Sequence, residues 1–498
     1  MGFAPAADWR KLPPEGKQLF LERLQRLRAS KVGAKFKRTY RDDPAGFVRD
    51  CFVWPIDEGP ADYQLEILST LVEQKRIAVR SPHGVGKTSL AAWVILWFAL
   101  TRDGSDGDWK IVSTASAWRQ LKNYLWPEVH KWARRLKWSK ILRSAFSSSE
   151  LLQLSLKLST GEAFAVASSD ANLIEGAHAD SLLYLFDESK SIPDGVFDSA
   201  EGALAAGDCY ALAISTPGEP VGRFYGIHSR KPGLESWSVR HVTLEEAIAA
   251  GRISRTWAED KKLLWGESSA IFQNRVLGEF HTSDADGVIP LSWIEAANER
   301  WEIWHESKEW LPFTAVGVDV GRSTDGDKTL LALRHGDVIT ELQRFAVADT
   351  MISAGHVASI LKARGGYGMI DLIGIGAGVY DRLREQGLEV KPFNAGASAE
   401  GMKDRSEELE FLNLRAAAWW RFRELLDPAF GSTVCLPPDD RLLGDLCAPH
   451  WRVTSSGKVQ IESKDEIRKR LGRSTDDGDA VVMSFFERPD EEWIWIAV

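Results

Sequence analysis

The sequence has few cysteines and no long hydrophobic run. Its four cysteines (Cys51, Cys209, Cys435 and Cys447) are widely spaced and form no C-x-x-C pair, which argues for a reducing compartment and against a structural zinc site. The amino-terminal stretch lacks the apolar core of a signal peptide. The longest apolar run, Leu90–Leu100, is too short to span a bilayer. These absences predict a protein of the cell interior with no membrane contact.

The sequence also lacks low-complexity tracts, internal repeats and an excess of positive charge. Its 62 Lys and Arg residues face 71 Asp and Glu residues, a net charge of −9, which argues weakly against a static nucleic-acid binder. One basic segment, Arg23–Arg41, contains no acid. It is either a solvated helix face or a local patch for DNA. A chain of 498 residues is too long for one compact core, so two or three domains are expected.

The order of apolar and polar segments predicts an α/β protein. Residues 1–45 are expected to form a basic helical arm. From 46 to 285 short apolar strands alternate with helices, as in a doubly wound domain with a buried parallel sheet, and residues 151–169 predict a hairpin around Ser159–Gly161. Residues 286–312, a turn-rich break and a Trp-rich amphipathic helix, predict a linker. A strand at Phe313 opens a second α/β domain, 313–498.

The stretch "AVRSPHGVGKTSLAAW", Ala78–Trp93, differs by one letter from the phosphate-binding pattern G-x-x-x-x-G-K-[ST]. Ser81 stands at the first position, where a glycine mainly eases a turn. Gly86, beside Lys87, is the glycine that lets the backbone approach the phosphates. A strand before the loop and a helix after it favour an ATP site, with Thr88 on Mg²⁺. The predicted nucleotide-binding residues of the loop are Ser81, His83, Gly84, Val85, Gly86, Lys87, Thr88 and Ser89.

Two adjacent acids follow the apolar run "SLLYLF". We expect Asp187 to hold Mg²⁺ through water, and Glu188 to orient and deprotonate the attacking water. The alternative is an ordinary strand end. A third strand, "CYALAISTPG", ends in Ser215 and Thr216, whose hydroxyls are suited to sensing the γ-phosphate.

The second domain carries four acids on predicted strands and a helix. Asp319 and Asp371 lie in apolar strands, and Asp476 and Asp479 share a helix face at i, i+3. Such a set suits a two-metal phosphodiesterase site. No His or Cys cluster competes, so Mg²⁺ or Mn²⁺ is implied. Taken singly, each acid also fits a structural role, such as a helix cap at Asp476.

Together these segments resemble the large terminase subunit of tailed bacteriophages, from about residue 46 to 487. The resemblance is carried by "ADYQLEIL", the degenerate phosphate loop, "LIEGAHADSLLYLFDES", "AISTPGEPVGRFY", "HTSDADGVIPLSWIEAA", "FLNLRAAAWWRFRELL" and "KVQIESKDEIRKRLGRSTDDGDAVVM". It implies a P-loop ATPase of the additional-strand, conserved-glutamate type, then a ribonuclease H-like nuclease. It implies that Gln64 contacts the adenine base. It also implies that Ser81 reflects the degenerate first position of the phosphate loop in this family. The family pattern S-P-D-x-x-D-A maps to Asp476 and Asp479, but Thr475 and an extra Asp477 leave the choice of ligands open.

The resemblance implies ATP-driven translocation of double-stranded viral DNA into the procapsid, and cutting of the concatemer. The implied cofactors are ATP, Mg²⁺ for the ATPase, and two Mg²⁺ or Mn²⁺ for the nuclease. The implied partners are double-stranded DNA, the portal of the procapsid, a small terminase subunit and further copies of the chain, as a pentameric ring during packaging with a monomer in solution as the other state. The implied location is the host cytoplasm, transiently at the portal vertex.

Three points stay open at this stage. The alternative functions are a DNA-repair helicase-nuclease and a non-catalytic scaffold on an ATPase-like fold. No arginine lies between Ala145 and Gly222, so the arginine finger of the family has to come from Arg80, Arg119, Arg134, Arg135, Arg143 or Arg223. The tail "ERPDEEWIWIAV" is either a final strand or a docking anchor for the portal.

Overall fold

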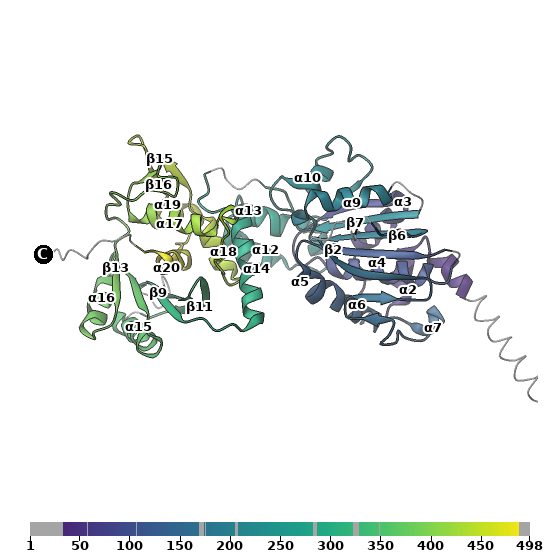
Figure 1. Cartoon of the computed structure of the whole chain (residues 1–498), viewed down its shortest axis with the longest axis horizontal. Helices are drawn as coiled ribbons and strands as arrows, with labels where there is room; N and C mark the ends of the chain where they lie inside the picture. Colours follow the sequence, from purple (N-terminus) through teal and green to yellow (C-terminus); the bar gives the residue numbers. More distant parts are fainter. Residues whose placement is uncertain are drawn as a thin grey trace, which may run out of the picture. The chain divides into compact units, whose positions relative to one another are not determined.

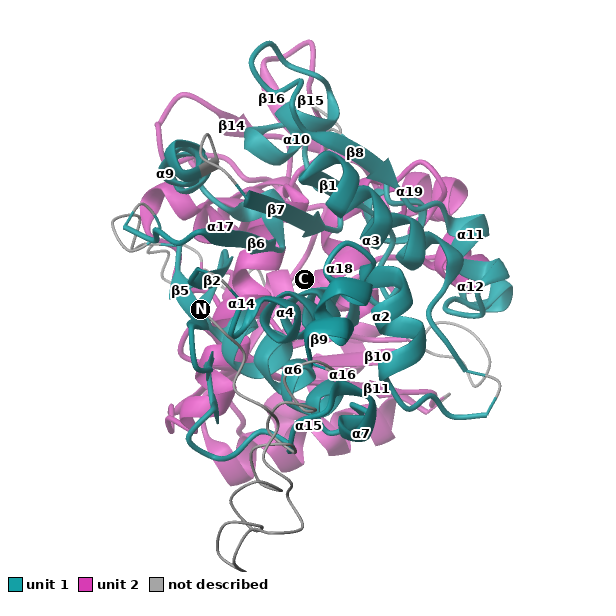
Figure 2. Ribbon diagram, turned by 90° about the vertical axis from the view of Figure 1, so that its right-hand side faces the viewer, with its two compact units in different colours: residues 1–257, 274–281 teal, residues 258–273, 282–498 magenta. Residues whose placement is uncertain are grey.

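A computed structural model describes residues 33–487, apart from 57, 106, 169–173, 175, 205–207, 282–285, 322–327 and 348. The chain divides into two compact units, residues 1–257 with 274–281 and residues 258–273 with 282–498; Figure 1 labels the elements and Figure 2 colours the units. The tail from 488 onward and most of the predicted amino-terminal arm lie outside the described residues. The described part of the arm is 33–45, of which residues 33–40 are helical and bury Phe36 and Tyr40.

The domain boundaries at 46, 286 and 313 stay predictions, and the structure adds two observations to them. Residues 258–273 group with the second unit, although the sequence places them before the linker. The predicted linker helix is α14 (Leu291–Ser307), which packs on that same unit. There Trp301 Nε1 donates to Ile339 O at 2.8 Å, and Asn298 Nδ2 donates to Leu436 O at 2.9 Å.

The first unit is built on one eight-stranded sheet in the order β3-β4-β5-β2-β6-β7-β1-β8. From β5 to β8 all neighbouring strands are parallel. β4 pairs antiparallel with β5, as the predicted hairpin requires. The strands are β1 (Arg76–Arg80), β2 (Trp109–Ala115), β3 (Leu151–Leu152), β4 (Ser155–Lys157), β5 (Gly161–Ala167), β6 (Ser181–Asp187), β7 (Asp208–Ser215) and β8 (Ser238–His241).

Helices cover both faces of this sheet, which is why its central strands are apolar throughout. In β6, Leu183 and Leu185 join the core on one face, while Tyr184 and Phe186 join the core on the other. The helix α4 (Lys87–Arg102) lies in the first core. The helices and turns of the unit are α2 (Pro44–Cys51), α3 (Asp62–Gln74), α4, α5 (Trp118–Gln120), η2 (Leu121–Leu125), α6 (Trp126–Ala133), α7 (Trp138–Ile141), η3 (Ser189–Ser191), α9 (Asp194–Leu204), α10 (Gly222–His228), α11 (Leu244–Ala249), the start of α12 (Arg255–Trp265), and η4 (Gln273–Leu277) from Asn274 onward.

The strand order places β7 between the strand that precedes the phosphate loop, β1, and the strand that ends in the acids, β6. This intervening strand is the additional strand that the sequence-based assignment expects. Because parallel strands end at the same edge of a sheet, the phosphate loop, Ser215 and Asp187 all lie at the carboxyl edge. The predicted fold class of the first unit is therefore confirmed.

The second unit contains a five-stranded sheet in the order β11-β10-β9-β12-β13. β9 pairs antiparallel with β10 and parallel with β12, so Asp319 and Asp371 end two neighbouring parallel strands. The strands are β9 (Phe313–Asp319), β10 (Thr329–His335), β11 (Val338–Phe345), β12 (Tyr367–Asp371) and β13 (Val390–Phe393). A smaller sheet, ordered β14-β16-β15, contains β14 (Glu410–Phe411), β15 (Trp451–Val453) and β16 (Lys458–Ile461).

Helices enclose the larger sheet. Side chains of α15 (Thr350–Arg364) and α16 (Gly376–Glu385) share a core with β9, β10 and β12. The acid-bearing helix α20 (Asp476–Phe485) crosses β9 at Gly317, where a Cβ atom would collide with the backbone of Ala480. The remaining elements are α13 (Ala270–Phe272), α17 (Leu414–Leu426), η5 (Pro428–Phe430), α18 (Asp440–Cys447) and α19 (Lys464–Leu471).

Candidate ATPase and nuclease sites

The phosphate loop joins β1 to α4 through a left-handed glycine. Gly86 has a φ of 83°, which costs other residues strain but is open to glycine. A Cβ there would also lie 2.8 Å from Gln64 Nε2. The loop can therefore present its backbone N–H groups at the start of α4, where the helix dipole favours an anion.

Lys87 turns back over the loop. Its Nζ lies 3.3 Å from Ser81 Oγ, 3.0 Å from Pro82 O and 2.9 Å from Thr216 Oγ1. Burial lowers the pKa of Lys87, and the charges of Glu188 and Asp187 oppose that shift. Ser81, fully buried, gives the lysine a hydroxyl acceptor at the position where the common pattern has glycine.

The amino end of α3 supports the loop from outside. Tyr63 Oη donates to Val85 O at 2.8 Å. The amide of Gln64 accepts from Ala61 N at 2.9 Å and donates to Gly86 O at 3.3 Å. Gln64 is buried and uses both ends of its amide within the protein, so its contacts support the loop; its predicted contact with adenine stays a prediction.

The other predicted loop residues differ in where they lie. His83 and Gly84 are exposed, and the His83 backbone N–H donates to Arg275 O at 2.9 Å. Thr88 is half-buried. Ser89 donates to Glu128 Oε1 on α6 at 2.7 Å, which ties the helix to its neighbour.

The two acids at the end of β6 have different environments. Asp187 is buried, and burial followed by the charge of Glu188 raises its pKa to about 7. Glu188 has a φ of 47°, a conformation that is costly for a side chain of this size and gathers at functional sites.

Ser215, at the end of the intervening strand, connects the two halves of this site. Its Oγ lies 3.2 Å from Glu188 Oε2 and 2.7 Å from Thr216 O. The next residue, Thr216, contacts Lys87. Lys87 and the carboxylate of Glu188 are therefore linked through two adjacent residues, Thr216 and Ser215.

Three of the arginine-finger candidates pair with acids of their own unit. Arg80 pairs with Glu279, Arg143 with Glu150 and Arg223 with Asp198. Arg135 lies over the ring of Trp132, 5.0 Å from its centroid. The choice among these and Arg119 and Arg134 stays open.

In the second unit, one lysine lies among three of the predicted acids. Lys464 Nζ is 2.7 Å from Asp319 Oδ2, 3.4 Å from Asp479 Oδ2 and 3.9 Å from Asp371 Oδ2. Burial lowers the pKa of Lys464, but the charges of Asp319 and Asp479 outweigh it and raise that pKa above its usual value. The structure thus brings together two strand acids and one helix acid around a single positive charge.

The acids of this cluster titrate differently. Burial raises the pKa of Asp319 to about 6, with Lys464 opposing and the charges of Asp476 and Asp479 adding to the rise. Burial also raises the pKa of Asp371 to about 6. Burial also tends to raise the pKa of Asp479, but the charges of Arg415 and Lys464 outweigh burial and hold that pKa below its usual value.

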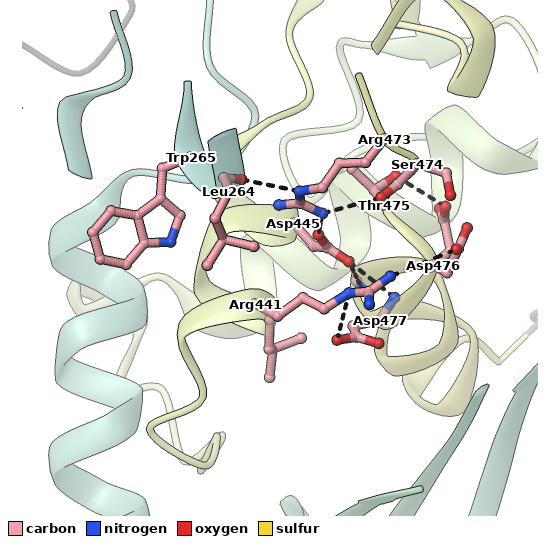
Figure 3. A network of polar contacts seen from close by, with 12 residues as sticks. Leu264, Trp265, Arg441, Asp445, Arg473, Ser474, Thr475, Asp476 and Asp477 are labelled. Carbon is pink, nitrogen blue, oxygen red and sulfur yellow. Dashed lines mark hydrogen bonds and ion pairs between the residues drawn. The ribbon is translucent and has the colours of Figure 1, made fainter. Parts of the chain in front are cut away.

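The neighbouring acid Asp477 belongs to a separate charge network, part of which Figure 3 shows. Arg344 Nη2 donates to Asp477 Oδ2 at 2.8 Å, and Arg441 Nε lies 3.4 Å from the same oxygen. Asp476 Oδ2 lies 4.0 Å from Arg441 Nη2. Asp477 is fully buried among these arginines and lies outside the set of acids that contact Lys464. Asp476 faces Arg441 as well, so its role as a ligand stays a prediction.

Lys464, Arg415 and Trp419 are the residues of this site that sequence reasoning missed. Lys464 follows the helix cap Ser463 in a segment crowded with charges, and Trp419 lies in a helix rich in Trp and Arg. Each side chain reaches an acid far away in the sequence, so no local spacing marks it. The segments "FLNLRAAAWWRFRELL" and "KVQIESKDEIRKRL", which carry part of the family resemblance, do contain the right helices.

The donor set of the cluster fits a hard divalent cation, because all its members are carboxylates. Within the described residues, no three acidic, histidine or cysteine side chains form a ready-made metal site. The three aspartates are instead arranged about the ammonium of Lys464. They converge on one positive charge, so these carboxylates are already arranged around a cation.

The fold of the two units fits a class of enzymes that combine a P-loop ATPase unit with a nuclease unit. No family model matches the sequence. The chain is 23% identical over 454 residues to the probable large terminase subunit of Enterobacteria phage P7, covering 84% of this chain and 86% of that protein. The resemblance to phage large terminases is thereby confirmed, and the helicase and scaffold alternatives are not favoured.

Solved structures of large terminases are also similar to the chain. The nuclease domain of the large terminase subunit gp2 of bacterial virus Sf6 is 18% identical, with 41% of this chain and 100% of that chain covered and a TM-score of 0.35. The large terminase of a thermophilic bacteriophage, in complex with ADP, is 12% identical, with 85% and 99% covered and a TM-score of 0.39.

A membrane-spanning helix is not found: none of the helices in the described part of the chain has both the length and the apolar composition to cross a bilayer.

Proposed function

We propose that this chain is a large terminase subunit that drives double-stranded viral DNA into a procapsid and cuts the concatemer. The observation that carries the proposal is the presence, in one chain, of the Lys87–Thr216–Ser215–Glu188 arrangement and the three aspartates around Lys464. The similarity to the phage P7 protein covers 84% of the chain, more than either unit alone contains.

In the ATPase unit, Glu188 is the general base that orients and deprotonates the attacking water. Lys87 and the backbone of the loop bind the phosphates, and Thr88 and Asp187 are the residues that would hold Mg²⁺. Ser215 and Thr216 transmit the presence of the γ-phosphate between Lys87 and Glu188. The raised pKa of Asp187 suits a carboxylate whose charge is stabilised only when a cation is bound.

In the nuclease unit, Asp319, Asp371, Asp476 and Asp479 are the residues that would hold two Mg²⁺ or Mn²⁺ ions. Such ions clamp the attacking and leaving oxygens of a phosphodiester. Asp319 and Asp371 contribute from rigid neighbouring strands and Asp479 from α20. Lys464 neutralises the carboxylates.

Partners and location follow from the same proposal. We infer that the chain assembles as a ring around DNA on the portal, with a small terminase subunit as a further partner, in the host cytoplasm. The P7 protein is a probable large terminase subunit by name, which supports DNA and procapsid as the partners.

The test compares two activities of the full chain: ATP turnover with and without duplex DNA, and plasmid cutting in Mn²⁺. Glu188→Gln should lower ATP turnover by roughly 10²–10⁴-fold, the usual contribution of a general base, and retain cutting. Asp371→Ala should abolish cutting and retain ATP turnover. A wild-type chain that unwinds forked duplexes and packages no DNA into procapsids would favour the helicase-nuclease instead.

A further inference from the structure

Two side chains of α17 donate hydrogen bonds to the carboxylate of Asp479. Trp419 Nε1 donates to Asp479 Oδ1 at 2.9 Å, and Arg415 Nη1 donates to the same oxygen. Trp419 is 1% exposed, Arg415 8% and Asp479 5%. Positions 415 and 419 are one helical turn apart and share a face, so one face of α17 supplies both donors.

The two oxygens of Asp479 therefore have separate partners. Oδ1 accepts from Arg415 and Trp419. Oδ2 accepts from Thr475 Oγ1 at 3.1 Å and lies 3.4 Å from Lys464 Nζ, the ammonium that Asp319 and Asp371 also contact. Rotation of the carboxylate would break the contacts on both sides, so Oδ2 stays turned toward the acid cluster.

The contacts of Arg415 are costly for stability. Its Nε and Nη2 atoms are buried and have no hydrogen-bond partner among the described residues. An unsatisfied buried donor costs free energy, and a charged one costs more. A residue kept for stability alone would satisfy these donors, whereas a residue that serves the orientation of one carboxylate need not.

We propose that Arg415 and Trp419 are positioning residues of the nuclease site, which fix Asp479 with Oδ2 presented to the metal ions. The proposal rests on the proposed function, because it assumes that the acid cluster binds metal. Trp419 is suited to the task because its Nε1 only donates and its buried ring prevents movement. Residues that hydrogen-bond to a metal ligand and fix its orientation contribute about 10–100-fold to metal affinity.

The test is Trp419→Phe, with Trp420→Phe as the matched control. Trp419→Phe keeps an aromatic ring but removes the donor to Asp479 together with part of the ring volume. Trp420 is the next residue of the same helix, is 7% exposed, and packs against Trp451 and Phe411. The two substitutions therefore remove equal volume from the same helix, but only one of them changes the support of Asp479.

The measurement is Mn²⁺ binding to the full chain without DNA, by the electron paramagnetic resonance of free Mn²⁺, followed by plasmid cutting across a Mn²⁺ titration. We expect Trp419→Phe to raise the half-saturating Mn²⁺ concentration about 10–100-fold, with cutting restored in part at high Mn²⁺. Trp420→Phe should match the wild type. Arg415→Gln, whose amide leaves Oδ1 without its charged partner, should shift the midpoint in the same direction as Trp419→Phe.

Two results would overturn the proposal: a Trp419→Phe midpoint equal to that of the wild type, or the same shift in Trp420→Phe. If Trp419→Phe does not fold, as judged by its melting curve, Arg415→Gln alone decides, and an unchanged midpoint there overturns the proposal. A wild-type chain that neither binds Mn²⁺ nor cuts DNA would overturn the proposed function itself, and the inference with it.

Discussion

Lys464 is the positive charge that three aspartates share. Its ammonium contacts Asp319, Asp371 and Asp479 within 3.9 Å, and its side chain is 32% exposed. Three clustered carboxylates repel one another strongly when ionised, so a cation among them stabilises the folded state. Lysine and metal ions can therefore compete for the same carboxylates.

We predict that Lys464→Met destabilises the protein in the absence of divalent metal. Removing one partner of a buried ion pair costs about 3–5 kcal/mol, which we reduce to about 1–3 kcal/mol because Lys464 is one-third exposed. Mn²⁺ should then raise the melting temperature of the variant more than that of the wild type. Thermal melts in EDTA and in Mn²⁺ measure both effects, and an equal response to Mn²⁺ would refute the competition.

The raised pKa values of Asp319 and Asp371, both about 6, predict how metal binding depends on pH. In the metal-free protein, the stability that comes from their neutral forms is lost as the pH rises through about 6. Metal binding requires the ionised forms, so it should strengthen over the same range. Below about pH 6 we expect the half-saturating Mn²⁺ concentration to rise roughly tenfold per pH unit for each proton displaced. A midpoint that does not change between pH 5 and 8 would contradict this.

At the scale of elements, the amino end of α20 depends on one buried acid of α18. Asp445 is fully buried and accepts from Asp477 N at 2.9 Å and Gly478 N at 3.2 Å. Arg473 pairs with the same carboxylate and donates from Nε to Leu264 O at 2.9 Å (Figure 3). The helix that carries the predicted ligands is thereby fixed to its neighbours at its first turn.

We predict that Asp445→Ala destabilises the protein by about 3–5 kcal/mol, because it leaves Arg473 unpaired and two N–H groups of α20 unsatisfied. Plasmid cutting should fall, since the first turn of α20 carries Asp476 and Asp479. The control is Glu385→Ala, which breaks the exposed pair with Arg382 and should cost less than about 1 kcal/mol. Chemical denaturation measures both, and equal losses in the two variants would rule out the capping role.

The whole molecule has a net charge of −9. Binding to DNA therefore has to come from local contacts with phosphates. A packaging motor has to hold the phosphate backbone of any sequence, so its affinity is expected to depend on salt more than on sequence.

We predict that duplex binding by the full chain weakens steeply between about 50 and 200 mM salt, by about 10³-fold or more if six or more phosphates are contacted. Two duplexes of unrelated sequence should bind alike. Fluorescence anisotropy with an ATP analogue present measures both properties, and strong preference for one duplex would count against the packaging function.

Most of the fold could be predicted from the sequence. Fully apolar runs such as those of β6 and β7 require a sheet buried on both faces, and Gly86 with Lys87 marks the strand–loop–helix junction. The acids Asp187, Glu188, Asp319 and Asp371 each follow or end such a run, so their place at the carboxyl edge of a sheet follows from the direction of the chain.

The sequence by itself determined these elements because hydrophobic periodicity and turn chemistry act over a few residues. Only the tertiary structure decided that Lys464 lies among three aspartates, that Arg415 and Trp419 orient Asp479, and that Asp477 pairs with Arg344 instead of joining the cluster. Most of these partners are separated by 60 to 145 residues, and Lys464 and Asp479, 15 residues apart, lie on different helices. Which charged side chain meets which carboxylate depends on how the helices pack on the sheet, and local sequence does not encode that packing.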